Sequence, residues 1–246
     1  MSGDRVARLF DVLELLATHR TGMSVTEVSK RLNLPLSSAH NLLQRLVAAD
    51  VVVASEGPRY SVGTRLVRLG IRTVDGLEVG TVARKHLAEL ARAVNSDVYL
   101  AVRLGTRVVY VERFPSGGSV AVEIRLGQEL FLHATAVGKL FSAFHPRLEK
   151  KMLDGPRPKL TEYTLTTRDA LRAELATIRE RGWAASREEA IPGIVGIALP
   201  ILDSNDQLTA AVHVSALRAH MDDAQLEAAV ELARASADAV ERDLGR

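Results

Sequence analysis

A helix, a tight turn, a second helix and a β-hairpin are predicted in that order between residues 23 and 63, and this order constrains the fold more than any other feature. Ser24 and Glu27 stand three residues apart, which is the spacing of a capping box at the start of a helix. Pro35 disfavours α geometry in the residue before it and so ends that helix. A second helix is predicted to start near Ser37, after a short turn.

The second helix combines an apolar stripe with a polar outer face. Its apolar positions have helical spacing: Ala39, Leu42, Leu43, Leu46 and Val47. The outer face carries small polar and basic residues: Ser37, Ser38, Asn41 and Arg45. A helix fits the major groove of DNA, and side chains of this kind read base edges there.

A β-hairpin is predicted directly after the two helices. Residues 51–54 and 59–62 are the expected strands around the turn Glu56-Gly57-Pro58, with Arg59 and Tyr60 at the tip. Pairs of short helices also occur in bundles that do not bind DNA, so the helix pair alone leaves both interpretations open. The hairpin after it is typical of a winged helix-turn-helix and favours DNA binding.

Composition and charge agree with a DNA-binding protein of the reducing cytoplasm. The 246 residues are 47% hydrophobic and 25% charged and include no Cys, which excludes a disulfide framework and thiolate metal sites. We expect no membrane segment and no secretory signal, because the chain lacks an apolar run of the ~18–20 residues that span a bilayer. Residues 1–70 carry a net charge of +3 and the remainder −1, a mild footprint of phosphate binding.

The pattern after the hairpin predicts a helical connection and a second domain. We expect a DNA-binding domain at 1–63, a helical linker at 64–76 and a second domain at 77–246. The second domain is expected to be α+β, with helices around one antiparallel sheet. Its predicted strands are 97–104, 107–114, 120–126, a short one ending at 186, 194–202 and 208–216, and its later helices are 135–144, 147–153, 168–181 and 224–243.

The sequence contains no recognisable catalytic constellation. A phosphate-cradling glycine loop, a nucleophile elbow and a His-Glu-x-x-His motif are missing. His133 and His213, with Glu188 or Glu189, have side chains that zinc accepts, but their wide separation is uninformative and hydrogen-bonded structural histidines are favoured. No metal or cofactor is therefore expected. The helix start at residues 134–137 offers free N–H groups to an anion, although every helix has such an end.

Four segments, in their order and spacing, resemble the IclR family of transcriptional regulators: TEVSKRLNLPLSSAHNLLQRL, RYSVGTRLVRLG, LHATAVGK and REEAIPGIVGIALPILDSNDQLTAAVHVSA. The resemblance covers essentially the whole chain. It implies an N-terminal winged helix-turn-helix joined by a helical linker to a GAF-like antiparallel-sheet domain that binds an effector and mediates oligomerisation. It also implies a homodimer or dimer of dimers on a palindromic operator in double-stranded DNA, with binding altered by a small organic acid of a catabolic pathway. Repressors and activators share this architecture.

Carried over by position, the resemblance implies DNA contacts from the second helix and the hairpin: Ser37, Ser38, His40, Asn41, Arg45 and Arg59. Two positions depart from the family pattern, because Leu36 and Asn41 stand where basic residues are usual. Fewer cations predict a weaker phosphate contribution, by roughly one unit of salt slope each if both would meet phosphates. Asn41 has instead the side chain that binds adenine through two hydrogen bonds.

The effector site implied by the resemblance comprises Ala136, Val137, Ser186, Gly196, His213 and Ser215. Leu126, Leu130 and Leu140 are candidate apolar walls, with core packing as the alternative role. Relatives often have an acidic residue at position 186, Cys or Ser at 196 and Ser at 213. Gly196 then predicts a roomier pocket for an aromatic or bulkier acid, and His213 adds a ring that donates, accepts or carries charge.

Two other functions compete with the regulator. An enzyme with an accessory winged helix would need a nucleophile and a base in a catalytic arrangement, and the sequence shows no recognisable one. An architectural or interaction protein without a small ligand would have a second domain filled solid with side chains.

Overall fold

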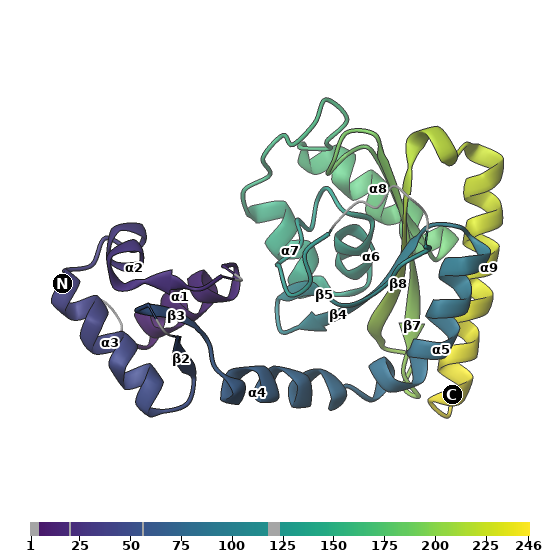
Figure 1. Ribbon diagram of the computed structural model, residues 1–246. Helices are drawn as coiled ribbons and strands as arrows, with labels where there is room; N and C mark the ends of the chain where they lie inside the picture. Colours follow the sequence, from purple (N-terminus) through teal and green to yellow (C-terminus); the bar gives the residue numbers. More distant parts are fainter. Residues whose placement is uncertain (1–4, 20, 56, 118–123) are drawn as a thin grey trace. The chain divides into compact units, whose positions relative to one another are not determined.

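The computed structural model describes residues 5–19, 21–55, 57–117 and 124–246. The chain divides into two units, Met1–Gly76 and Leu77–Arg246, each with its own sheet and its own buried core (Figure 1). No helix in the described ranges is long and apolar enough to cross a membrane.

The N-terminal unit is a winged helix-turn-helix. Its elements are α1 (Arg5–Ala17), β1 (Met23–Ser24), α2 (Val25–Arg31), α3 (Leu36–Ala48), β2 (Val52–Ser55), β3 (Arg59–Val62) and α4 (Thr64–Asp75). Strand β3 lies between β1 and β2 and is antiparallel to both. The buried apolar side chains form one core: Val12, Leu13, Leu16, Met23, Val28, Ala39, Leu43, Leu46, Val52 and Tyr60.

Local hydrogen bonds account for both ends of α2. The Ser24 hydroxyl accepts from the Glu27 amide at 3.3 Å, and a Glu27 carboxylate oxygen accepts from the Ser24 amide at 2.7 Å, which confirms the predicted capping box. After the helix, Asn33 has a φ of 51°, and Ser29 donates to the Leu34 carbonyl at 2.7 Å. These bonds close the turn that orients α3.

The C-terminal unit has a five-stranded antiparallel sheet in the order β5-β4-β8-β7-β6, between two layers of helices. Its elements are α5 (Glu78–Ala93), β4 (Asp97–Leu104), β5 (Arg107–Phe114), α6 (Ala136–Phe144), α7 (Pro146–Asp154), α8 (Arg168–Arg181), β6 (Ala184–Arg187), β7 (Ile194–Leu202), β8 (Leu208–Leu217), the 3₁₀ helix η1 (Arg218–His220) and α9 (Asp223–Asp243). Helices α5 and α9 cover one face, and α6 covers the other with α7 and α8 against it (Figure 1). This is the α+β architecture expected from the sequence.

Two local expectations differ in detail from the structure. Of the strand expected at 120–126, residues 120–123 lie outside the described residues, and residues 124–126 are not in a strand. The first strand of the wing is shifted by one residue, to Val52–Ser55. Helix α4 begins at Thr64 with Gly63 as its N-cap, as the predicted linker at 64–76 requires. A Cβ at Gly63 would lie 2.6 Å from the Asp50 carbonyl oxygen, so only glycine allows this close approach of two backbone segments.

Candidate DNA-binding and effector sites

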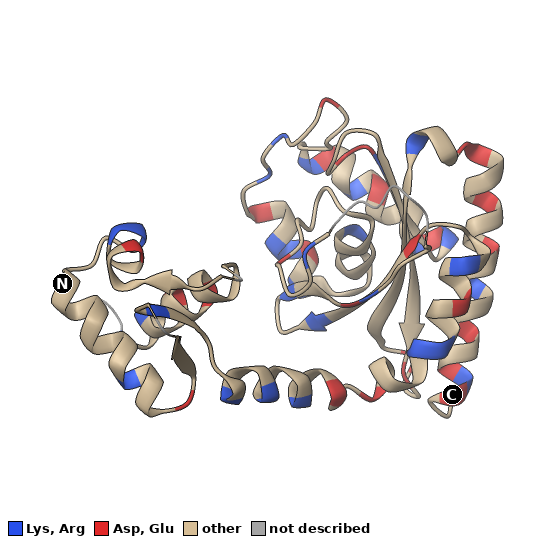
Figure 2. Ribbon diagram, viewed as in Figure 1, with Lys and Arg blue, Asp and Glu red and all other residues tan. Residues whose placement is uncertain are grey.

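Helix α3 turns five of the six predicted DNA contacts to solvent. Ala39, Leu43 and Leu46 anchor its inner face in the core. Its N-cap, Pro35, supplies no side-chain hydrogen bond to the first turn. The free amides of that turn are donors that bind DNA phosphates in other proteins. The exposed side chains are Ser37, Ser38, His40, Asn41 and Arg45. Figure 2 shows further Lys and Arg residues on α2 and α4 of the same unit.

Arg59 and Tyr60, which were expected at the tip of the wing, make hydrogen bonds that connect the wing to the rest of the unit. Tyr60 is buried in the core, and Gln44 of α3 donates to its hydroxyl at 3.0 Å, so the tip position predicted for Tyr60 is wrong. The Arg59 guanidinium donates to the Thr21 and Gly22 carbonyl oxygens at 3.1 and 2.7 Å. It also pairs with Glu27 at 3.5 Å. In this structure Arg59 therefore links the wing to the start of α2, and its contact with DNA stays a prediction.

A cavity of about 250 Å³ lies in the C-terminal unit, between the sheet and the start of α6. Five of the six predicted effector residues line it: Ala136, Ser186, Gly196, His213 and Ser215. Val137 is the exception, because its side chain is fully buried in the core between α6 and the sheet. Of the three candidate apolar walls, Leu130 lines the cavity, whereas Leu126 is exposed and Leu140 is buried in that core.

Several residues that line the cavity were not predicted from the sequence. Tyr110 reaches the cavity from β5, and Ala190 and Ile191 reach it from the loop between β6 and β7. None of them lies in a motif, and only the pairing of distant strands brings them to the site. Side chains alternate along β5, and this places Tyr110 on the face of the sheet that α6 covers. The sequence does not reveal which face α6 covers, because the strand order of the sheet is needed for that.

The start of α6 is held closely against its surroundings and leaves two amides free. Thr135 caps the helix by accepting from the Gly138 amide at 3.0 Å. No described residue accepts a hydrogen bond from the amides of Ala136 and Val137. The Ser186 hydroxyl donates to the Ala134 carbonyl at 2.7 Å and ties β6 to this helix start. Free amides and the positive end of a helix dipole favour an anion, and Thr135 and Ala136 at this helix start line the cavity.

His213 occupies the space that the sequence predicts to be open. A Cβ on Gly196 would lie 2.6 Å from His213 Nε2, so the imidazole fills the volume next to Gly196. The expectation of a pocket enlarged by Gly196 is therefore wrong. The Tyr110 hydroxyl lies 2.8 Å from His213 Nδ1.

His213 is also unsuited to carry charge. Burial lowers the pKa of His213 to about 3, so the imidazole is neutral at physiological pH. Burial, with a smaller contribution from Tyr99, raises the pKa of Tyr110 well above its usual value, so the phenol is neutral too. Of the three roles considered for the ring, donating and accepting hydrogen bonds are left, and carrying charge is not.

Two family models match the chain, the IclR helix-turn-helix domain over residues 5–55 and the bacterial transcriptional regulator IclR C-terminal domain over residues 71–242. The chain belongs to the IclR family. Members of this family are DNA-binding transcriptional regulators and not enzymes, so this chain is an IclR-family regulator.

Known proteins resemble this IclR-family regulator along nearly its full length. The HTH-type transcriptional regulator XynR of Escherichia coli is 30% identical, and the alignment covers 98% of this chain and 96% of XynR. The glycerol operon regulatory protein of Streptomyces griseus is 32% identical, with 95% of this chain and 93% of that protein covered. The crystal structure of an IclR homologue from Microbacterium hydrocarbonoxydans, complexed with 4-hydroxybenzoate, superposes with a TM-score of 0.86 at 27% identity, over 98% and 99% of the two chains.

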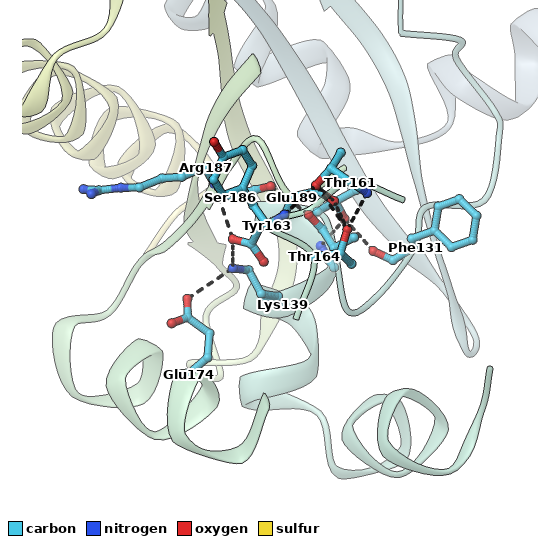
Figure 3. A network of polar contacts seen from close by, with 12 residues as sticks. Phe131, Lys139, Thr161, Tyr163, Thr164, Glu174, Ser186, Arg187 and Glu189 are labelled. Atoms are coloured by element: carbon cyan, nitrogen blue, oxygen red, sulfur yellow. Dashed lines mark hydrogen bonds and ion pairs between the residues drawn. The ribbon is translucent and has the colours of Figure 1, made fainter. Parts of the chain in front are cut away.

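A buried ion-pair network supports one wall of the regulator's cavity (Figure 3). Lys139 on α6 is 1% exposed, and its ammonium lies 2.7 Å from Glu189 and 3.3 Å from Glu174. The Thr164 hydroxyl donates to the Glu189 carbonyl at 2.7 Å. Burial raises the pKa of Glu189, and Lys139 opposes that rise. Because Glu189 precedes the lining residue Ala190, this network fixes the loop between β6 and β7.

The two histidines weighed as zinc ligands lie in separate environments. His133 Nε2 lies 3.0 Å from the Pro158 carbonyl, and burial lowers the pKa of His133. His213 is held by Tyr110. Within the described ranges no three His, Asp or Glu side chains are grouped to hold a metal ion.

Proposed function

We propose that this regulator is a homodimer that acts in the cytoplasm and binds a palindromic operator, and that a small aromatic monocarboxylic acid in the α6 cavity alters that binding. One observation carries the proposal: free amides of a helix start meet apolar walls in one cavity. The amides suit a carboxylate, and walls such as Leu130, Phe131 and Ile191 suit an apolar ring. A second domain without a cavity would favour a protein that binds no ligand, whereas the described residues of this domain enclose a cavity of about 250 Å³.

The inner polar groups of the cavity favour one negative charge on the ligand. Tyr110, Ser186, His213 and Ser215 are all neutral, so a second carboxylate beside them, away from the exposed Arg125 of the lining, would lose its hydration without gaining an ionic partner. A monocarboxylate avoids this cost. The complex of the related IclR homologue with 4-hydroxybenzoate supports the same ligand class.

Exposed apolar side chains on α1 and α4 support the homodimer. Val6 and Phe10 on α1 are 61% and 55% exposed, and Val67, Leu69 and Ile71 on α4 are 50% to 61% exposed. Apolar surface of this extent is expected to be covered in the functional protein. A second copy provides the cover and supplies the second reading helix that a two-fold symmetric operator requires.

Regulation then follows from linkage between the two sites. An effector that binds one arrangement of the dimer more tightly shifts the population toward it, and by no more than that difference in affinity. If operator-bound and free dimers differ in effector affinity, the operator and the effector change each other's binding by the same factor.

Substitutions on α3 are expected to separate base contacts from phosphate contacts. Asn41→Ala should weaken operator binding by about 1–3 kcal/mol and relax the preference at one base pair. Arg45→Ala should weaken binding to all sequences and reduce the salt slope by about one unit. Fluorescence anisotropy on operator and random DNA at several salt concentrations measures both effects. Lys150→Ala, on the other unit, is the control, and equal behaviour of all three variants would contradict the assignment.

Isothermal titration calorimetry tests the proposed effector class directly. Benzoate and 4-hydroxybenzoate represent aromatic monocarboxylates, and acetate and succinate represent small and dicarboxylic acids. We expect saturable heat from an aromatic acid and none from the other two at equal concentration. Binding of acetate or succinate alone would refute the ligand class. Sedimentation equilibrium of the same sample measures its molar mass, and we expect the mass of a dimer.

A further inference from the structure

An exposed leucine stands at the start of the helix that is proposed to read DNA. Leu36 is the first residue of α3, and its side chain is 56% exposed. It belongs neither to the core of the N-terminal unit nor to the partly buried apolar side chains packed against that core. Along α2 and α3, which the structure describes in full, it is the one large apolar side chain that is exposed. Packing within the unit therefore does not account for it.

Leu36 shares an open hollow of about 430 Å³ with residues that are proposed to contact DNA. The hollow lies between the start of α2 and the start of α3, and it is lined by Val25, Thr26, Leu36, Ser37, His40 and Asn41. The last three are predicted DNA contacts. In a helix-turn-helix, the N-terminal residues of the second helix contact base edges in the major groove. Leu36 is therefore placed to meet the same bases as its neighbours in the hollow.

The chemistry of the leucine side chain limits what it can recognise there. An isobutyl group neither donates nor accepts a hydrogen bond, so it binds neither a phosphate oxygen nor the polar edge of a base. The C5 methyl of thymine is the one apolar group that the base pairs present in the major groove. Contact between the two removes apolar surface of both from water, which favours binding. Leucine at this position thus fits thymine better than the other three bases.

We propose that Leu36 contacts the methyl group of a thymine in each half of the operator and selects for that base. The thymine lies close to the adenine expected at Asn41, because both residues line the same hollow. This inference rests on the proposed function, since it names a base that the proposed reading helix recognises. The contact involves no charge, so it does not weaken as salt rises, unlike the contact of a lysine or arginine with a phosphate.

Replacement of thymine by deoxyuridine tests this contact, because the two bases differ by the methyl group alone. The probe is a palindromic duplex that the wild-type protein selects from random DNA, with each symmetric pair of thymines replaced in turn. Fluorescence anisotropy should show, for one pair, a loss of affinity of roughly fourfold per half-site, or about 15-fold for the dimer. This loss should be the same at low and at high salt, which a contact with phosphate would not produce.

Two variants at position 36 and one control make the test specific. In Leu36→Ala the same replacement should change the affinity by less than about twofold, because the contacting side chain is gone. Leu36→Met keeps an apolar side chain of similar volume and should keep most of the loss. Val53→Ala is the control, because Val53 on the wing is also an exposed apolar residue of this unit, and it should keep the full loss. All three positions in the folded protein are exposed, so thermal unfolding should be unchanged.

The possible outcomes separate this inference from the proposed function. If the wild type selects no sequence from random DNA, the proposed operator binding fails and the inference fails with it. If it selects an operator but no deoxyuridine replacement weakens binding, or if Leu36→Ala keeps the full loss, the inference alone fails. If Leu36→Ala instead weakens the dimer in sedimentation equilibrium and leaves the deoxyuridine loss unaltered, Leu36 belongs to a protein interface, and the inference is overturned.

Discussion

Replacing Lys139 by Met is expected to lower the free energy of unfolding of the C-terminal unit by about 3–5 kcal/mol. The substitution leaves the Glu189 carboxylate buried without its closest cation, 2.7 Å away in the wild type. One Glu189 oxygen already has no hydrogen-bond partner among the described residues, so little else compensates the lost charge. Urea denaturation followed by circular dichroism measures the change.

The pH dependence of this loss follows from the Glu189 carboxyl. Removing Lys139 raises the pKa of Glu189 further above its ordinary 4.5, because the cation that opposes the effect of burial is gone. A carboxyl with a raised pKa in the folded state favours folding only while it is protonated, so stability falls as pH rises from the unfolded pKa through the folded one. The deficit of Lys139→Met should therefore be larger at pH about 8 than at pH about 5.

Two further variants keep this prediction specific. The double variant Lys139→Met with Glu189→Gln removes both charges and should recover part of the lost stability. The exposed Lys150→Met should change stability by less than about 0.5 kcal/mol. A loss in Lys139→Met that does not change with pH, or that the double variant deepens, would contradict a buried ion pair as the cause.

Leu43→Ala is expected to abolish operator binding while effector binding in the other unit persists. Leu43 on α3 is fully buried in a core of about ten side chains, and truncation of such a residue costs about 2–5 kcal/mol. A unit of 76 residues has little stability in reserve. The reading helix then loses its fixed position even where the polypeptide stays partly folded.

Anisotropy with operator DNA and calorimetry with the effector, on the same preparation, measure the two halves of this prediction. Ser38→Ala is the matched control, because it alters an exposed position of the same helix without touching the core. It should weaken DNA binding only modestly and leave the unfolding transition unchanged. Full operator affinity in Leu43→Ala would show that the core of this unit does not position α3.

Local signals predict much of this fold because each depends on a few neighbouring residues. The capping box at Ser24 is confirmed by reciprocal hydrogen bonds, and the hairpin of β4 and β5 lies at the predicted residues. The interpretation of Gly196 went wrong for the opposite reason. Gly196 was judged alone, whereas the room that it leaves is filled by His213 across two strands.

Side-chain roles were harder to predict than elements. Tyr60 and Arg59 follow a turn, which predicts exposure, yet pairing of β3 with β1 places Tyr60 in the core and Arg59 against Gly22. The partner of Lys139 lies fifty residues away in a loop, and no spacing rule connects them. The DNA and effector assignments themselves stay predictions that the experiments above test.

A mobility-shift titration with and without an effector tests whether effector binding changes operator binding. The full chain is titrated onto DNA from upstream of its own gene and of neighbouring genes, in the presence of benzoate, its monohydroxy isomers or acetate. We expect specific retention of one fragment, with an apparent affinity that an aromatic acid changes and acetate does not. Specific retention that no aromatic acid alters, although calorimetry shows such an acid bound, would contradict the proposed linkage between the two sites.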